Sequence, residues 1–481
     1  MSSQQATEAQ PAGWFSAFVE ENGLVVIVLG AFAIALVVAL RKDLVVDGWM
    51  ALVSGRLIAQ HGLPFHDTLT VWTHGDRWTD QQWLAQLGLY GLWRAGGIKL
   101  MLLVHALLVT SGLIIAALIA RKRGASALSV TWIAIPVLIA YYPVASVVRP
   151  QSFAFPLFAT TLWLVLSDAD RPSRRVFLVL PLLVLWTNLH GSVLLGAMLV
   201  SLAGVVAMVE RRRLSGHGIT LLLAPWACLF ASPYALHLPA YYDKILVGGH
   251  FKKFVTEWAP TTLTPGTAAV YLLVLGGLWL LGRAGRDAPL LDQLSFVLTA
   301  VLAFEAVRNT AWVGLVALAV LPPLVDRVRG PVQNPPRMNR VLAITILATT
   351  LFAVAAVATK PTSWFTTKFP AAAAQSAAAA AGHDGRVFAT SPYADWLLWS
   401  QPALTGRVAF DARFELLSTR DVQRIAQLQA RSGDWIKTVS GYRVFVLNTR
   451  SDRSLERSLI KRLPARVVFS SPQVVVLRRA G

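Results

Sequence analysis

Apolar residues occur in long runs that recur along most of the chain and are separated by short polar segments. We identify eleven such runs of about 15 to 22 residues, long enough as helices to cross a bilayer core of roughly 30 Å. They lie near 24–40, 99–120, 126–148, 152–167, 176–189, 192–209, 219–232, 266–282, 289–305, 311–326 and 341–358. This pattern predicts an α-helical polytopic membrane protein with about eleven transmembrane helices.

Basic residues follow every even-numbered run. These residues are Arg121–Arg123, Arg171, Arg174, Arg175, Arg211–Arg213, Arg283, Arg286, Arg327, Arg329, Arg337 and Arg340. Loops rich in Lys and Arg stay in the cytoplasm, so residues 1–23 are predicted to form a cytoplasmic tail and the C-terminus to lie outside. Arg41 and Lys42 are the exception, because they follow the first run on the predicted outer side.

The first outer loop, residues 41–98, is long and patterned. One helical stretch runs from Asp47 to Gln60, and a second runs from Asp80 to Trp93 before Gly96 and Gly97. Their aromatic and aliphatic residues recur at helical spacing, which predicts two helices lying in the membrane interface. The loop is treated as part of a transmembrane bundle spanning residues 24–358.

The composition agrees with a membrane protein and excludes two other classes. Apolar residues make up 55% of the 481-residue chain and charged residues only 14%, against roughly 25% charged in average proteins. A soluble or disordered chain would need more charge. The formal net charge of +19 is mostly topology signal, so we expect no nucleic-acid partner. Cys228 is the single cysteine, so no intramolecular disulfide can form.

The last hundred residues have a soluble composition. Residues 359–384 form an alanine-rich linker or helix, and residues 385–481 are predicted to form a small extracytoplasmic α/β domain. The predicted strands are 386–390, 407–411, 443–447, 465–470 and 473–477, and the predicted helices are 418–431, 433–439 and 451–462. Asp411, Arg413 and Glu415 follow the end of a predicted strand, where ligand contacts often lie, but a structural Asp411–Arg413 ion pair is the favoured interpretation. The domain carries no phosphate-binding glycine loop, zinc motif or hydrolase motif.

Polar residues stand where the runs end on the predicted outer side. Each would cost free energy at membrane depth, so such groups tend to face a cavity. They are Arg149, Asn188, His190, Tyr234, Glu257, Arg308 and Asn309. Together with Asp47, we expect Arg149, His190, Glu257 and Arg308 to converge at the outer mouth of the bundle.

This layout resembles the GT-C superfamily of polytopic glycosyltransferases, which use lipid-linked sugars. The motifs that carry the resemblance to a group of bacterial GT-C-like membrane proteins are D-G-W-M-A-L-V-S-G-R-L-I-A-Q-H-G-L-P-F-H-D-T-L-T at 47–70, W-T-D-Q-Q-W-L at 78–84, R-P-Q at 149–151, N-L-H-G at 188–191 and G-R-V-A-F-D-A-R at 406–413. Asp47 occupies the acidic position that this superfamily places after its first span. Many members carry paired acids there, whereas the nearest acids here are Asp43 and Asp67.

The resemblance implies transfer of a sugar from a polyprenyl-phosphate-linked donor to a glycan, lipid or protein acceptor at the outer membrane face. Asp47 is then the candidate general base. Candidate phosphate-binding residues are Arg149, Arg308, His190, Arg41 and Lys42. Candidate sugar- or acceptor-binding residues are Asp67, His66, Asn188, Tyr234, Glu257 and Asn309. Asp47 and Asp67 are the candidate ligands for a divalent cation such as Mg²⁺ or Mn²⁺.

Two other functions remain open at this point. A lipid-linked glycan transporter would use the same outer cations, but it should show repeated halves and a polar cluster at the inner end, neither of which the sequence indicates. A non-catalytic envelope-assembly scaffold should expose a large apolar patch on its C-terminal domain, whereas an enzyme lid should face the bundle mouth. The Ala and Arg content with short loops suggests a bacterial plasma membrane.

Overall fold

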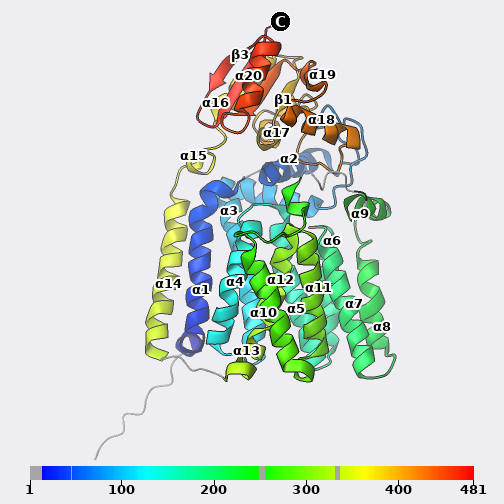
Figure 1. Cartoon of the computed structure of the whole chain (residues 1–481), viewed down its shortest axis with the longest axis vertical. Coiled ribbons are helices and arrows are strands. Elements are labelled where there is room, and N and C mark those ends of the chain that lie inside the picture. Colours follow the sequence, from blue (N-terminus) through cyan, green and yellow to red (C-terminus); the bar gives the residue numbers. More distant parts are fainter. Residues whose placement is uncertain (1–13, 45, 247, 249–254, 331–335, 481) are drawn as a thin grey trace, which may run out of the picture.

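The computed structural model describes residues 14–44, 46–246, 248, 255–330 and 336–480. A helical bundle forms one part of the molecule, and a small mixed domain stands on one end of it (Figure 1). Residues 1–13 of the predicted cytoplasmic tail lie outside the described residues, and α1 begins at Trp14. The remaining residues predicted for that tail belong to this helix.

Each of the eleven predicted runs is largely helical, but the count of spanning helices needs correction. Within the described ranges, seven helices are long and apolar enough to cross a membrane, or eight if the bent pair α12–α13 counts as one span. The seven are α1 (Trp14–Asp43), α3 (Trp83–Lys122), α4 (Ala127–Ala145), α5 (Ala154–Asp170), α7 (Val193–Glu210), α10 (Ala268–Ala284) and α14 (Pro336–Ala358). The chain is therefore a multi-pass membrane protein.

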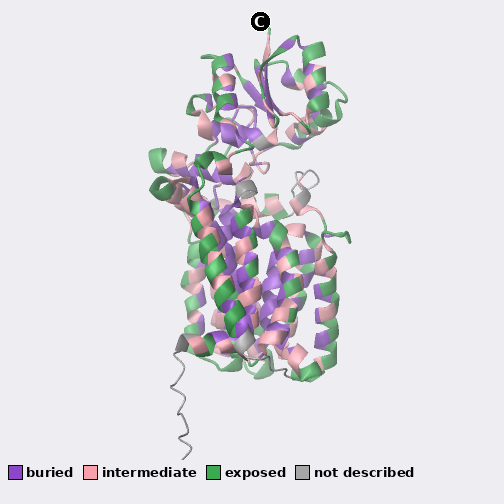
Figure 2. Cartoon of the chain, turned by 90° about the vertical axis from the view of Figure 1, so that its left-hand side faces the viewer, coloured by how far each residue is buried: buried purple, intermediate pink, exposed green. Residues whose placement is uncertain are grey.

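Five further helices are shorter, and a 3₁₀ turn or a proline accompanies four of them. The five are α6 (Val179–Thr187), α8 (Gly216–Cys228), α11 (Leu290–Glu305), α12 (Thr310–Val320) and α13 (Pro322–Arg329). A 3₁₀ turn precedes α6, Pro225 lies inside α8, and α12 bends by 46° into α13 where two prolines interrupt the backbone hydrogen bonds. Buried side chains fill the interior of the bundle, whereas the outward face of α14 is exposed and apolar, with Phe352 73% exposed (Figure 2).

The outer loop forms the layer between the bundle and the C-terminal domain. The first predicted helix is α2 (Val46–His61), and the second forms the start of α3, which kinks at Gly96 and Gly97. Residues 48–55 of α2 are all buried. Arg56 donates hydrogen bonds to the carbonyls of Leu398 and Trp399, at the end of α17 (Ser391–Ser400). The C-terminal domain therefore covers α2.

The C-terminal domain is built on a four-stranded mixed sheet with the order β1-β2-β4-β3. Its elements are α16 (Ala371–Ala381), β1 (Val387–Ala389), α17, α18 (Thr419–Ala430), α19 (Trp435–Val439), β2 (Val444–Asn448), α20 (Arg453–Arg462), β3 (Ala465–Ser470) and β4 (Val474–Arg479). β1 pairs with β2 in parallel, and the other pairs are antiparallel. The short α15 (Thr362–Phe365) connects this domain to α14.

The prediction of a strand at 407–411 was wrong, and the prediction missed a helix between the first two strands. Residues 407–411 form isolated bridges rather than a strand, because Val408 pairs with Thr70 of the outer loop as well as with Val387. The backbone N–H groups of Val71 and Trp72 donate to the carbonyls of Val408 and Ala409. Helix α17 was missed between β1 and β2. The outer loop and the C-terminal domain are thus joined by backbone hydrogen bonds.

Candidate active site

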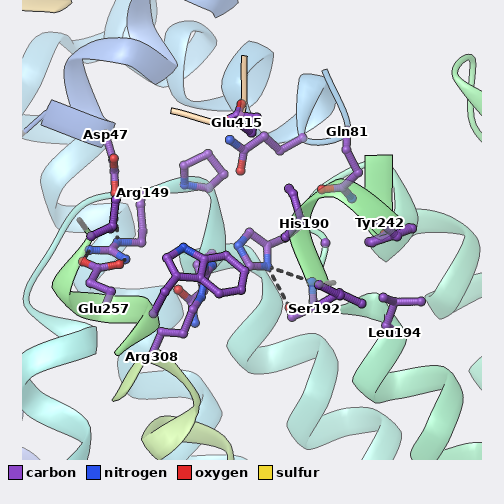
Figure 3. A pocket seen from close by; sticks show the side chains of 18 of the residues that line it. Asp47, Gln81, Arg149, His190, Ser192, Leu194, Tyr242, Glu257, Arg308 and Glu415 are labelled. Atoms are coloured by element: carbon purple, nitrogen blue, oxygen red, sulfur yellow. Dashed lines mark hydrogen bonds and ion pairs between the residues drawn. The ribbon is translucent and has the colours of Figure 1, made fainter. Parts of the chain in front are cut away.

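A cavity of about 380 Å³ lies at the end of the bundle that carries the C-terminal domain. Its size is within the roughly 300–1,000 Å³ of typical small-molecule sites. Asp47, Arg149, His190, Glu257 and Arg308, the five residues expected to converge, all line it, as does Asn309. The structure therefore brings these six together from segments far apart in the sequence. Figure 3 shows Asp47, Arg149, His190, Glu257 and Arg308 around the cavity.

Arg149 holds two carboxylates at one side of the cavity. Its terminal nitrogens each donate a hydrogen bond of 2.6 Å to an oxygen of Glu257, and its Nε lies 3.4 Å from Oδ2 of Asp47. Burial alone would lower the pKa of Arg149, but Asp47 and Glu257 together raise it. Arg149 precedes Pro150, which favours the extended backbone observed there (φ −158°). The Arg149 guanidinium is therefore permanently charged and already paired.

Asp47 lies in the first turn of α2, where the helix dipole favours a carboxylate. Its side chain is 42% exposed despite the contact with Arg149, so the carboxylate stays accessible from the cavity. Gly48, the next residue, lets the start of α2 pack closely against the backbone at Val148. An added Cβ would lie 2.8 Å from Leu44 Cδ1 and 3.3 Å from the carbonyl oxygen of Val148. A ligand in the cavity would meet Asp47 at the mouth.

Arg308 is the cation of the cavity that has no carboxylate partner. It lies between α11 and α12 in the 3₁₀ turn η7 (Val307–Asn309), with its guanidinium carbon 4.4 Å from the ring centre of Trp258. Within the described ranges, no carboxylate oxygen approaches it within 4.0 Å. Burial would raise the pKa of Glu257, but the hydrogen bonds and charge of Arg149 lower it, and the positive charge of Arg308 lowers it further. Arg308 is thus available to an anion.

His190 presents one ring nitrogen to the cavity and uses the other internally. Its Nδ1 accepts a hydrogen bond from the backbone N–H of Ser192 and lies 2.8 Å from the Ser192 hydroxyl. Burial lowers its pKa well below the usual value, and the charges of Arg308 and Arg149 lower it further. His190 is therefore neutral and carries its proton on Nε2, which makes it a hydrogen-bond donor to a ligand.

The C-terminal domain contributes to the cavity two residues for which the sequence left a ligand contact open but did not favour it. Arg413 and Glu415 line it, beside Gln81 and Tyr241 of other segments. Burial raises the pKa of the Glu415 carboxyl to about 7. The sequence signals for them are their position after a predicted strand end and the G-R-V-A-F-D-A-R motif, which ends two residues before Glu415.

Arg413 also connects the two layers. It pairs with Asp411 as predicted, and its second partner is Asp67 of the outer loop, at 2.6 Å. Its guanidinium carbon lies 4.2 Å from the ring centre of Trp78. The predicted Asp411–Arg413 ion pair is confirmed, with a wider role in joining the domain to the loop.

Four proposed ligand residues do not line the cavity. Asp67 is fully buried and accepts hydrogen bonds from Leu69 N–H, Thr70, Thr73 and Arg413. His66 is exposed and pairs through its backbone with Arg77.

Asn188 and Tyr234 are engaged in internal hydrogen bonds. The Asn188 amide donates to the Val184 and Ala231 carbonyls and accepts from Trp83 Nε1. The Tyr234 hydroxyl donates to the Pro64 carbonyl. All four residues therefore shape the outer layer, away from the cavity wall.

The remaining candidates concern charge and metal. The side chains of Arg41 and Lys42 lie outside the described residues. In the described part of the chain, no group of three or more His, Cys, Asp and Glu residues is arranged to hold a metal ion. Asp47 lines the cavity and Asp67 does not, so these two do not face one ligand position. A divalent cation stays a prediction.

The chain was compared with known proteins at three levels. No protein-family model matches it, and no curated protein matches its sequence. Among solved structures, ArnT from Cupriavidus metallidurans bound to undecaprenyl phosphate aligns over 96% of this chain and 98% of that chain, with a TM-score of 0.55 and 14% identity. The apo structure of the same ArnT aligns over 95% of this chain and 97% of that chain, with a TM-score of 0.51 and 13% identity.

The chain has the GT-C fold. A third structure, the archaeal oligosaccharyltransferase AglB from Archaeoglobus fulgidus in complex with an inhibitory peptide and a dolichol-phosphate, aligns over 91% of this chain and 70% of that chain, with a TM-score of 0.43 and 12% identity. The two ArnT structures carry the assignment. The GT-C likeness extends over nearly the whole chain, including the C-terminal domain.

Proposed function

We propose that this protein is a membrane glycosyltransferase that moves a sugar from a polyprenyl-phosphate-linked donor to an acceptor hydroxyl. The observation that carries the proposal is the cavity that both the accessible carboxylate of Asp47 and the guanidinium of Arg308 line, the latter without a carboxylate partner among the described residues. Its ArnT neighbour binds undecaprenyl phosphate. The GT-C fold supports the reaction class but not the residue roles, which are argued from the site itself.

Asp47 acts as the general base. During transfer, the acceptor oxygen forms a bond to the anomeric carbon of the sugar while the bond from that carbon to the phosphate oxygen breaks. The acceptor proton passes to the Asp47 carboxylate and then to solvent, and the prenyl phosphate leaves. Arg149 positions Asp47 from behind through its Nε and is itself fixed by Glu257. General-base catalysis typically contributes about 10²–10⁴-fold to the rate.

Arg308 and His190 receive the phosphate. Charge grows on the phosphate oxygens as the sugar leaves, and Arg offers two donors in a fixed plane to such an anion. His190, neutral with its proton on Nε2, adds a hydrogen bond without adding charge. Arg149, a candidate phosphate-binding residue from the sequence, is not assigned a phosphate contact here, because both of its terminal nitrogens donate to Glu257.

An apolar wall provides a path for the prenyl chain. Leu194, Leu195 and Met198 of α7 line the cavity, together with Leu302 of α11 and Ile245 of α9 (Leu238–Leu246). A prenyl chain that enters from the lipid between the helices would lie along these side chains, with its phosphate at Arg308. Glu415 and Gln81, at the C-terminal-domain side of the cavity, would contact the sugar or the acceptor.

The scaffold alternative is less well supported. An assembly scaffold would present its C-terminal domain outward, whereas here Arg413 and Glu415 of that domain line the cavity. The outer-face orientation follows only from the basic loops. We propose the bacterial plasma membrane as the location and a glycan, lipid or protein as the acceptor.

The test is product release by the purified full chain. It is incubated with a panel of polyprenyl-phosphate monosaccharides and lipid, glycan and peptide acceptors, and free polyprenyl phosphate is measured. Release by the wild type, its loss in Asp47→Asn and its retention in Asp76→Asn support the proposal. Asp76 is the matched control because it is exposed in the same outer loop and does not line the cavity. Equal release by the Asp47→Asn variant would remove Asp47 as base.

The same assay addresses the cation. The protein is treated with a chelator, and Mg²⁺ or Mn²⁺ is then added back. Restoration of lost release by either ion supports a metal-assisted transfer, whereas unchanged release after chelation argues that the charge of Arg308 and the hydrogen bond from His190 stabilise the phosphate without a metal.

A further inference from the structure

A second cavity, of about 550 Å³, lies at the end of the bundle opposite the first. It is formed where α3 and α5 end, where α11 begins and where α12 bends into α13 (Figure 1). The sequence indicated no polar cluster at this end. That expectation was wrong, because charged residues separated by up to 205 positions, from Lys122 to Arg327, line one space.

The floor of this cavity is an ion-pair network with one unused oxygen. Arg123 donates to both oxygens of Asp170, at 3.1 and 3.2 Å, and to Oδ2 of Asp292 at 2.7 Å. Asp292 is only 3% exposed, and its Oδ1 has no hydrogen-bond partner in the part of the chain that the structure describes. A buried carboxylate oxygen without a donor costs free energy. A ligand hydroxyl reaching the floor would supply that donor.

The rim of the cavity is formed by cations that are not neutralised. Lys122, Arg171 and Arg327 are exposed, and no carboxylate lies within 4.0 Å of them among the described residues. Lys122 lies 4.2 Å from the ring centre of Trp163, and Arg327 donates to the Asp287 carbonyl. With Arg123 there are four cations against two carboxylates, Asp170 and Asp292, so the cavity carries a net charge of +2.

The position of the rim along the helices favours a lipid headgroup over a soluble phosphate as the ligand. Lys122 and Asp170 belong to the last turns of two spanning helices, and Trp163 lies one to two turns inside, which is the depth of lipid headgroups. Basic pockets between transmembrane helices at this level bind anionic headgroups. A zwitterionic headgroup would satisfy Asp292 with its ammonium but would leave the rim with its excess positive charge.

We propose that this cavity binds the headgroup of an anionic phospholipid that carries free hydroxyls, as in phosphatidylglycerol. The phosphate lies among Lys122, Arg171 and Arg327, and a glycerol hydroxyl donates to Oδ1 of Asp292. The site is separate from the Asp47 cavity, so this inference does not depend on the proposed transferase activity. Bound lipid at this position would fix the ends of α3, α5 and α11 relative to one another.

The experiment is native mass spectrometry of the purified full chain with added lipids of equal acyl chains. Phosphatidylglycerol should bind at least about tenfold more tightly than phosphatidylcholine, and more tightly than phosphatidylethanolamine or phosphatidic acid. The triple variant Lys122→Gln, Arg171→Gln and Arg327→Gln should lose this preference. The matched control is Arg211→Gln, Arg212→Gln and Arg213→Gln, which removes three exposed cations at the same end but outside the cavity and should keep the preference.

Several results would overturn the proposal. Equal loss in the two triple variants, both eluting as monodisperse protein, would show that loop charge acts without a site. Equal binding of phosphatidic acid would remove the hydroxyl contact, and preference for phosphatidylethanolamine would remove the anionic selection. Thermal stabilisation by inorganic phosphate or glycerol 3-phosphate alone, absent in the cavity triple variant, would assign the site to a soluble phosphate rather than to a lipid.

Discussion

Arg149 and Glu257 are joined by two hydrogen bonds of 2.6 Å, one from each terminal nitrogen of the guanidinium. This pair uses both of the nitrogens that would otherwise grip a phosphate, and the third guanidinium nitrogen faces Asp47. The two arginines of the cavity therefore have different roles. Arg149 positions acids, and Arg308 remains for the substrate.

Substituting Arg149 by Lys should weaken the fold as well as the activity. Lys keeps the charge but cannot form the two-point contact with Glu257. Because Asp47 and Glu257 are both more than a third exposed, solvent compensates in part, and we expect a loss of about 1–3 kcal/mol. The thermal midpoint in detergent measures this effect. A variant as stable and active as the wild type would show that the two hydrogen bonds between Arg149 and Glu257 are dispensable.

Substituting Arg308 by Gln should weaken donor binding while leaving the fold intact. A hydrogen bond to a charged group contributes about 1.5–3 kcal/mol, which corresponds to roughly 10–100-fold in affinity. Titration with undecaprenyl phosphate measures the change. Arg94→Gln is the control, since Arg94 is exposed on α3 and does not line the cavity. Unchanged affinity in the Arg308 variant would place the phosphate elsewhere.

The alternation of apolar runs and basic loops allowed part of the site to be predicted. It assigned Arg149, His190, Glu257 and Arg308 to the same side of the bundle, because each follows an odd number of the eleven apolar runs, and the structure places them around one cavity. It could not show their pairing. Which of two arginines binds a neighbouring acid depends on packing between helices distant in the sequence, and no local pattern encodes it.

The layers above the bundle were less predictable. Asp67 stands in a motif that suggests chemistry, yet it is enclosed by Thr70, Thr73 and Arg413. Residues 407–411 have the alternation of a strand, but their hydrogen bonds go partly to the outer loop. Contacts between residues more than 300 positions apart decide both outcomes, so sequence alone did not separate a ligand residue from a structural one.

Glu415 should make stability depend on pH near neutrality. Burial raises its pKa in the folded chain to about 7 from the usual 4.5, so the folded state binds the extra proton. The contribution of Glu415 to the free energy of unfolding is then fully present below pH 4.5 and is lost as the pH rises through about 7. Because the side chain is partly exposed, we expect a loss of about 1 kcal/mol rather than the roughly 3 kcal/mol that the whole shift would give.

The Glu415→Gln variant tests this dependence. It removes the titrating group, so it should unfold at a higher temperature than the wild type at pH 8, and the difference should shrink towards pH 4.5. Parallel pH profiles of thermal midpoint for the two proteins would contradict the prediction. The comparison is made between the two proteins at each pH, so titrating groups that do not interact with Glu415 cancel.

Asp67→Asn should act on stability rather than on substrate affinity. Asp67 is fully buried and pairs with Arg413 at 2.6 Å, and breaking such a pair typically costs about 3–5 kcal/mol. A lower thermal midpoint with an unchanged KM for donor in the residual folded protein is the expected pattern. An unaltered midpoint together with a raised KM would instead restore Asp67 as a ligand residue.

Asp47 is the centre of the proposed mechanism, and single-turnover transfer by Asp47→Asn tests it most directly. The substitution keeps the shape of the side chain and removes its ability to accept a proton. With undecaprenyl-phosphate affinity and thermal midpoint matched to the wild type, the transfer rate should fall by at least about 100-fold, while Asp76→Asn transfers normally. A rate within a few-fold of the wild type would contradict the role of Asp47 as the base.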